Sequence, residues 1–265
     1  MKNQSEKTKK FYNETGWKVV GGITEDARLN EDLRACAKSY VSNCRKRVGD
    51  HLPKTGRALL DMASGPIQYP EYLEYSKNFE KRVCVDLSQL ALDQAREKIG
   101  EKGEFYCADF LDLPLQENSF DCSISLHTIY HMHADEQEKA VRKLIHVTKV
   151  GAPIIIVYAN PDYLLQTWIN KIKRIVGKEL NEKSEYSLYN QSHVLTWWDQ
   201  FKNQAEVQIY PWRSLSSRHQ KLFFLNNVIG KIMFYVLEKL ENTFPNFFVR
   251  HFKYPMIVLT KKSYN

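Results

Sequence analysis

Residues 57–66, RALLDMASGP, have the pattern of a short buried strand that ends in an acid and continues into a turn of small residues. Two more apolar runs end in an acid, at Arg82–Asp86 and at Glu104–Asp109. Stretches with helical spacing of apolar residues separate the runs, and Ser88 can cap one of these helices. This alternation is typical of βαβ units and predicts a parallel sheet.

Four more runs extend this pattern. Phe120–Leu126 and Ile154–Tyr158 complete five strands within about a hundred residues, which predicts a doubly wound α/β sheet. Ala205–Tyr210 and Met256–Lys261 have the pattern of two further strands. The intervening helices are expected to begin near Pro70, Asp135 and His193, the one from Asp135 ending at Gly151.

The composition is that of an ordinary globular protein, with 43% hydrophobic and 26% charged residues among 265. No apolar run is long enough to span a membrane and the start of the chain is polar, so we expect a cytoplasmic protein, with peripheral membrane contact as a further option. The five cysteines are scattered without a CxxC pair, which argues against a disulfide framework. The whole net charge of +7 arises after residue 160, where 15 Lys and Arg face 8 Asp and Glu.

Asp61, Asp86 and Asp109 each close a predicted strand. One such aspartate is usually a cap or a turn former, but three in register indicate a nucleoside pocket, because ligands bind at the carboxyl ends of parallel strands. The turn after Asp61 contains a single glycine, Gly65, where a dinucleotide site needs GxGxxG. The turn therefore argues against NAD or FAD and permits a nucleoside ligand that lacks a pyrophosphate.

At these residues the chain resembles the class I S-adenosylmethionine-dependent methyltransferases. The matching segments are LLDMASGP (59–66), VCVDLS (83–88) and CADFLDLPLQENSFDCSISLHTIYHM (107–132). The resemblance implies a Rossmann-like sheet of seven strands, mostly parallel with the last strand antiparallel, and helical N-terminal and C-terminal caps. Ala63 and Ile67 depart from the family pattern because they stand at glycine positions, and VTKVGAP (147–153) lacks the usual proline and second glycine.

The resemblance also implies that the cofactor is S-adenosylmethionine and assigns residues to it. The first acid and the small turn would hold the methionine moiety, the second acid the ribose hydroxyls, and the third acid the adenine amino group. These assignments agree with carboxylates as acceptors for hydroxyl and amino donors. The expected cofactor residues are Asp61, Ala63, Ser64, Gly65, Asp86, Leu87, Asp109, Phe110 and Leu126.

Methyl transfer is a direct displacement, so a base is needed only for an acceptor that must lose a proton. His127 and His131 follow the fourth predicted strand and are the candidate general bases, although histidines there could equally pack or cap. Tyr12, Trp17 and Tyr130 are candidates for a lid or for contact with the acceptor; the alternative for the first two is that they only anchor the N-terminal helix. The histidines of this segment lack zinc-type spacing, so no metal is expected.

We expect a single domain, with a helical lid over residues 1–50, a cofactor core over 51–160, and cap insertions plus two strands over 161–265. The segments 164–178, which include the basic stretch Trp168–Lys178, and 222–240 are rich in apolar residues. Their pattern suits an anionic membrane or a lipid-linked acceptor, with a cap on the sheet or a homodimer interface as alternatives. No nucleic-acid partner is expected, because no dense basic run or RNA-binding module is present.

The expected reaction is therefore methyl transfer to a small-molecule acceptor, with O-methylation of a sugar, lipid-linked or secondary-metabolite-like compound favoured. Three alternatives stay open: an N-methyltransferase acting on a small amine, a nicotinamide-dependent oxidoreductase, and a non-catalytic nucleoside-binding protein.

Overall fold

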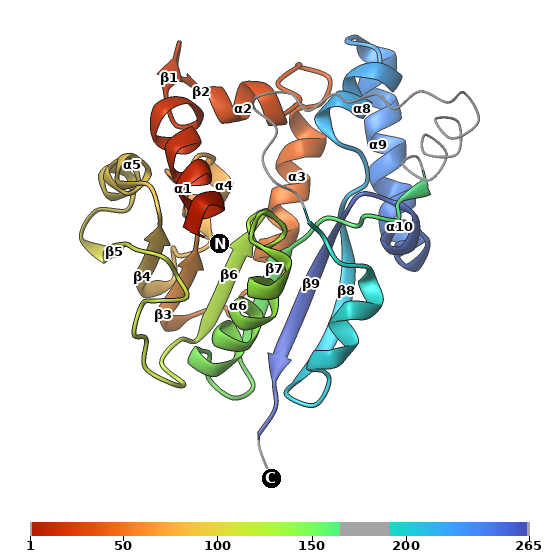
Figure 1. Ribbon diagram of the computed structural model, residues 1–265. Coiled ribbons are helices and arrows are strands. Elements are labelled where there is room, and N and C mark those ends of the chain that lie inside the picture. Colours follow the sequence, from red (N-terminus) through yellow and green to blue (C-terminus); the bar gives the residue numbers. More distant parts are fainter. Residues whose placement is uncertain (1, 165–190, 264–265) are drawn as a thin grey trace.

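The computed structural model describes residues 2–164 and 191–263, which form a seven-stranded sheet with helices on both faces (Figure 1). The spatial strand order is β5-β4-β3-β6-β7-β9-β8. The strands are β3 (Gly56–Met62), β4 (Phe79–Asp86), β5 (Gly103–Cys107), β6 (Cys122–Leu126), β7 (Pro153–Val157), β8 (Ala205–Arg213) and β9 (Tyr254–Lys261). The pairs from β5 to β7 are parallel, and β9 is antiparallel to both of its neighbours. The predicted mostly parallel sheet with an antiparallel last strand is confirmed.

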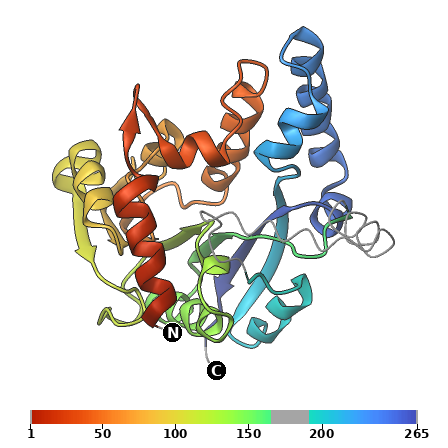
Figure 2. The same ribbon diagram turned by 45° about the horizontal axis from the view of Figure 1, so that its top comes forward.

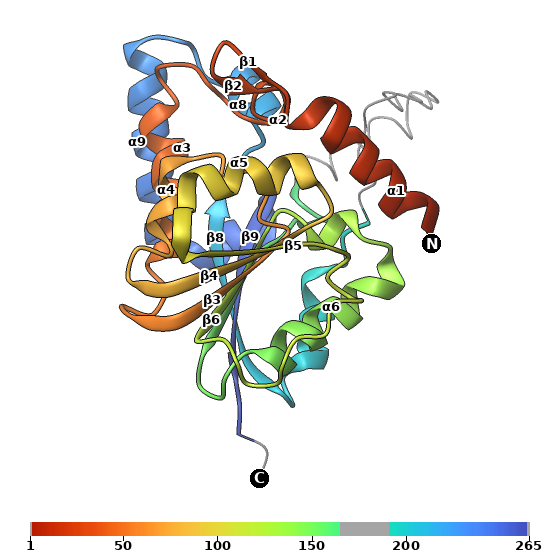
Figure 3. The same ribbon diagram turned by 90° about the vertical axis from the view of Figure 1, so that its left-hand side faces the viewer.

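Two helical layers cover this sheet (Figure 3). On one face lie α3 (Lys38–Gly49), α4 (Pro70–Glu74) and α5 (Gln89–Ile99), and on the other lie α6 (Ala134–Val147) and the short helix η4 (Leu195–Phe201). Strand alternation divides the core between them, so Leu60 packs toward α6 while Leu59 packs toward α3. Residues 38–49 thus belong to the core layer, and the segment available as a lid ends before them.

Local chemistry sets several element ends. Ser88 caps α5 as predicted, its Oγ accepting from the Ala91 N–H at 3.2 Å. Strand β5 ends at Cys107, short of the predicted Asp109, whose carboxylate accepts from the Leu111 N–H at 2.9 Å and turns the chain out of the sheet. The predicted start of the fourth strand at Phe120 was also too early, because Phe120 forms only an isolated bridge with Thr148.

Two helix boundaries also differ from the sequence prediction. The helix expected to end at Gly151 stops at Val147, after which the chain turns back toward β7. The expected helix from His193 is the 3-10 helix η4, two residues shorter at its start. Short 3-10 helices follow α5 and β6: η2 (Gly100–Lys102) and η3 (Ile129–His131).

The end of the sheet where the parallel strands finish is covered by segments from both ends of the chain (Figures 1 and 2). From the N-terminal side come α1 (Lys2–Phe11), the π-helical turn η1 (Tyr12–Gly16), the hairpin β1 (Val19–Val20) with β2 (Ile23–Thr24), and α2 (Glu25–Asn30). From the C-terminal side come α8 (Ser217–Phe223) and the start of α9 (Val228–Thr243), which leads to α10 (Pro245–His251).

The expected basic stretch Trp168–Lys178, and residues 165–178 of the predicted membrane-contact segment, lie outside the described residues. None of the helices that the structure describes is both long and apolar enough to cross a bilayer.

Candidate active site

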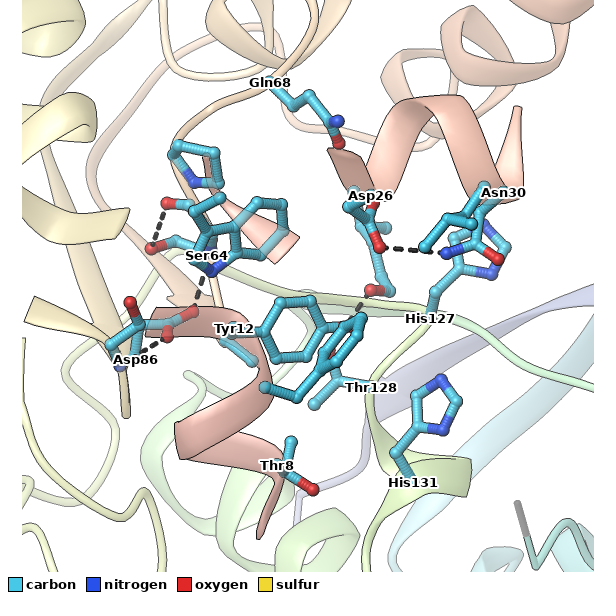
Figure 4. A pocket seen from close by; sticks show the side chains of 18 of the residues that line it. Thr8, Tyr12, Asp26, Asn30, Ser64, Gln68, Asp86, His127, Thr128 and His131 are labelled. Atoms are coloured by element: carbon cyan, nitrogen blue, oxygen red, sulfur yellow. Dashed lines mark hydrogen bonds between the residues drawn. The ribbon is translucent and has the colours of Figure 1, made fainter. Parts of the chain in front are cut away.

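A cavity of about 660 Å³ lies at the carboxyl ends of β3, β4 and β6 (Figure 4). A smaller hollow of about 100 Å³ adjoins it, since residues such as Ala63, Asp86 and Leu87 line both. The volume of the larger cavity is typical of small-molecule and cofactor sites. All nine residues that the sequence assigns to a cofactor line one or both hollows.

The turn after β3 keeps a backbone that normally requires glycine. Ala63, Gly65 and Ile67 all have left-handed φ angles, of 58°, 56° and 49°. Ala63 is fixed there by its N–H, which donates to the Val85 carbonyl at 2.7 Å. The turn therefore has a backbone that suits glycine, although alanine and isoleucine stand at two of the expected glycine positions.

Asp86 is anchored between this turn and the next helix. Its Oδ2 accepts from the Gly65 N–H at 2.9 Å and its Oδ1 accepts from the Ser88 N–H at 2.8 Å. Burial raises the pKa of Asp86 to about 6, against the lowering effect of these hydrogen bonds. The carboxylate is thus held at the junction of the two hollows and is ready to interact with a hydroxyl donor or a cation.

The Asp61 side chain accepts a hydrogen bond from an arginine of the neighbouring strand β4. The register that sets Leu59 opposite Arg82 places the arginine on the same face as Asp61, and Arg82 Nε donates to Asp61 Oδ2 at 3.1 Å. Both side chains are almost fully buried, and burial raises the pKa of Asp61 while Arg82 lowers it. No sequence pattern indicated this partner, and contact between Asp61 and a methionine moiety stays a prediction.

The third acid lies on the other side of Asp86. Asp109 and Phe110 line the smaller hollow together with Leu87, whereas Leu126 and Ser64 line the larger cavity. The three aspartates lie at the carboxyl ends of three adjacent strands, with Asp61 in β3, Asp86 in β4 and Asp109 just after β5. Asp86 therefore lies between the two hollows. Asp109 and Phe110 line the smaller one, and the turn after β3 lines the larger one.

His127 follows β6 directly and has a left-handed φ of 59°. Its Nδ1 lies 2.9 Å from the Tyr130 hydroxyl, and its ring centroid lies 4.4 Å from that of Trp212. Nε2 is buried and has no hydrogen-bond partner among the described residues. Burial, followed by the positive charge of Arg213, keeps the pKa of His127 well below its usual value, so the imidazole is neutral near pH 7.

His131 lines both hollows, with its ring 4.4 Å from that of Tyr130. Within residues 2–164 and 191–263, no group of three or more His, Cys, Asp or Glu side chains is arranged to hold a metal ion.

An aromatic pair from the N-terminal segment covers the turn. Tyr12 and Trp17 stack with ring centroids 4.7 Å apart, and Tyr12 points into the cavity (Figure 4). A Cβ at Gly65 would lie 3.2 Å from the Trp17 ring, so the missing side chain is what permits this close approach. Gln94 Nε2 also donates to the Trp17 carbonyl at 3.2 Å. Both predicted lid residues thus lie over the predicted cofactor turn.

The sequence did not reveal the side of the cavity remote from Asp109. Glu31 there receives two guanidinium groups, Arg45 Nη2 at 3.0 Å and Arg213 Nη1 at 2.7 Å. These residues come from distant segments that carry no motif, and only the repeated tyrosines of IQYPEYLEY (67–75) offered a signal. Besides Glu31 and Arg213, the residues that line this side are Asp26, Tyr69, Tyr72, Lys253 and Tyr254.

Residues 60–156 match the family described as "Methyltransferase domain". The chain contains a class I S-adenosylmethionine-dependent methyltransferase domain. Over 119 residues, 43% of this chain, the domain is 29% identical to the ajmaline N-methyltransferase of Rauvolfia serpentina. The chain covers 40% of the length of that relative.

Solved structures of two other proteins share the fold of this methyltransferase domain and its caps. Geranyl diphosphate C-methyltransferase of Streptomyces coelicolor A3(2) superposes with a TM-score of 0.58 at 14% identity, covering 97% of each chain. The [4+2]-cyclase SpnF gives the same TM-score and identity, covering 98% of each chain. Because the second protein is named a cyclase, the shared fold does not by itself determine the reaction.

Proposed function

We propose that this protein transfers a methyl group from S-adenosylmethionine to a hydroxyl oxygen of a small-molecule acceptor. The observation that carries the proposal is the anchored Asp86 carboxylate at the junction of two hollows, with all the predicted cofactor residues around it. Supporting it, the matched family covers this same stretch of chain.

The residues present fit this cofactor. Asp86 would accept hydrogen bonds from the ribose hydroxyls, and the hollow with Leu87, Asp109 and Phe110 would hold the adenine. The turn of Ala63 to Gly65 would lie beside the methionine moiety. When bound, S-adenosylmethionine supplies an electrophilic methyl carbon, and the carboxylates favour its positive charge.

His127 is the proposed general base. In the tautomer with Nδ1–H donated to the Tyr130 hydroxyl, Nε2 is an unoccupied acceptor. That atom can take the proton that a hydroxyl acceptor loses as its oxygen gains the methyl group. Trp212 and Tyr254 pack edge-on around the ring, with centroids 4.4 and 5.3 Å away, and fix its orientation.

A second candidate, N-methylation, is favoured by the name of the curated relative. A neutral amine is already a nucleophile, so that reaction needs no strong base. Replacement of His127 discriminates between the two candidates. For a hydroxyl acceptor, His127→Asn should lower kcat by about 10²- to 10⁴-fold, and asparagine suits the left-handed backbone at this position. His131→Asn is the comparison, and unchanged turnover in both variants would remove the base from the mechanism.

The identity of the reaction is tested by an acceptor screen. The protein is incubated with S-adenosylmethionine and extracts or compound panels, and mass spectrometry records acceptors that gain one methyl group. We expect gain of a methyl group on an oxygen. Cofactor binding with no methylated product across the panel would favour a binding protein or another reaction, while binding of NAD in preference to S-adenosylmethionine would favour an oxidoreductase.

A further inference from the structure

Large apolar side chains are exposed at the end of the molecule that carries the cavity. The most exposed of them are Leu222, near the end of α8, and Val228, at the start of α9, each with 72% of its surface accessible. We call the exposed apolar residues of this end the apolar rim, which comprises Val19, Val20, Leu29, Leu33, Leu222, Leu225, Val228, Ile229 and Ile232. A concentration of exposed apolar side chains at one end of a molecule is typical of an interaction site.

The apolar rim borders the mouth of the cavity. Leu29 and Arg218, from α2 and α8, line the cavity itself. Arg34 connects the two sides, because its guanidinium donates to the carbonyl oxygens of Gln220 at 2.9 Å and Phe224 at 2.7 Å. Figures 1 and 3 both place the β1–β2 hairpin, α2 and α8 at this same end.

All charged side chains in the α8–α9 part of the apolar rim are positive. Residues 217–237 contain Arg218, Lys221 and Lys231 and no aspartate or glutamate. Exposed apolar side chains among cations fit a surface that is apolar inside and negatively charged at its boundary, as in an anionic lipid leaflet. A second copy of this chain is a poorer partner, because it would bring the same positive charges together and would lie across the cavity mouth.

We propose that the apolar rim docks on a lipid bilayer containing anionic headgroups and holds the cavity mouth against the membrane. Membrane docking does not depend on the proposed methyl transfer. The consequence for the substrate rests on the proposed function: an acceptor held in the bilayer, with an apolar tail and a hydroxyl at the headgroup level, enters the cavity from the lipid side.

The test is flotation of the 265-residue chain with vesicles of phosphatidylcholine alone and of phosphatidylcholine with phosphatidylglycerol. We expect binding to the anionic vesicles that weakens at high salt. Val228→Glu should lower vesicle affinity about tenfold or more, because it removes apolar burial and adds a negative charge. The substitution suits the fold, since residue 228 begins α9, where an acid is favourable. Lys221→Ala and Lys231→Ala should each lower the affinity about fivefold.

Val150→Glu is the matched control. Val150 is 51% exposed and lies at the opposite end of the sheet, next to Gly151, whose N–H donates to the Lys261 carbonyl at 2.8 Å. This variant should bind vesicles as the wild type does. Absence of the wild type from the lipid fraction at both compositions would overturn the proposal. So would equal effects of the two valine variants, or a concentration-dependent dimer in sedimentation that Val228→Glu abolishes.

Titration of the same proteins with S-adenosylmethionine separates the two proposals. Val228→Glu should bind the cofactor like the wild type, because Val228 lines neither hollow. Flotation without cofactor binding would support the docking proposal and contradict the proposed function. Cofactor binding without flotation would contradict the docking proposal and leave the proposed function in place.

Discussion

The Asp86 carboxylate lies where the two hollows of the site meet. Burial raises its pKa to about 6, whereas the two backbone N–H groups that it accepts favour the charged form. Part of the population is therefore protonated near pH 6 in the free protein. Ribose hydroxyls and a sulfonium cation both stabilise the carboxylate, so a bound cofactor should lower this pKa.

Cofactor binding should consequently release protons near pH 6, up to about half a proton per site, and none at pH 8. Calorimetry in two buffers of different ionisation enthalpy measures the release. Burial also raises the pKa of Asp26 to about 6, so Asp26→Asn serves as the control and should leave most of the release in place. Proton uptake, or identical heats in the two buffers at pH 6, would contradict the role assigned to Asp86.

Asp61 illustrates what a residue pattern cannot reveal. The acid at the end of β3 was visible in the sequence, but its partner Arg82 is set by strand register, which no local pattern encodes. His127 is similar. Its place after the fourth strand was predicted, whereas its neighbours Trp212 and Tyr254 come from strands far along the chain.

Because Arg82 and Asp61 are buried together, Asp61→Asn should cost about 3 kcal/mol of the free energy of unfolding, measured by urea denaturation. Glu80→Gln is the matched control, since Glu80 and Arg57 are 3.8 Å apart with about three quarters of each side chain exposed. That control should change the free energy of unfolding by less than about 0.5 kcal/mol. A small effect at Asp61 would show that the buried pair does not stabilise the fold.

At the scale of elements, sequence periodicity predicted the seven strands, and the resemblance implied that they are mostly parallel with an antiparallel last strand. The element ends were less predictable, because side-chain hydrogen bonds decide them. Asp109 ends β5 early by accepting from the Leu111 N–H. The far side of the cavity was missed, since Arg213 and Tyr254 reach it only through the pairing of β8 with β9.

The left-handed backbone at Ala63, in the turn after β3, should lower the free energy of unfolding. Ala63 is held at a φ of 58°, which disfavours any residue with a Cβ. Ala63→Gly should therefore raise the free energy of unfolding by up to about 1 kcal/mol, after the greater flexibility of glycine in the unfolded chain is subtracted. Ala58→Gly, a buried site on β3 itself with no left-handed φ, should destabilise. Thermal or urea unfolding compares the two, and destabilisation by Ala63→Gly would contradict the left-handed turn.

At the scale of the whole molecule, segments from the N-terminal and C-terminal parts of the chain meet over the carboxyl ends of the parallel strands. The N-terminal segment brings Tyr12 and Trp17 onto the cofactor turn, and the C-terminal segment brings Arg213 and Lys253 to the other side of the cavity. Both ends also contribute to the apolar rim. The site, its cover and its surroundings are thus assembled at one end of the sheet.

Isothermal titration calorimetry of the purified protein with S-adenosylmethionine and with NAD tests the proposed cofactor site most directly. If Asp86 belongs to such a site, we expect one S-adenosylmethionine to bind per chain and NAD to give no heat. Asp86→Ala should bind at least about tenfold more weakly, because charged hydrogen bonds are lost, while Asp93→Ala, exposed on α5, should bind normally. No binding of S-adenosylmethionine by the wild type, or equal affinity in the Asp86 variant, would contradict the proposed cofactor site.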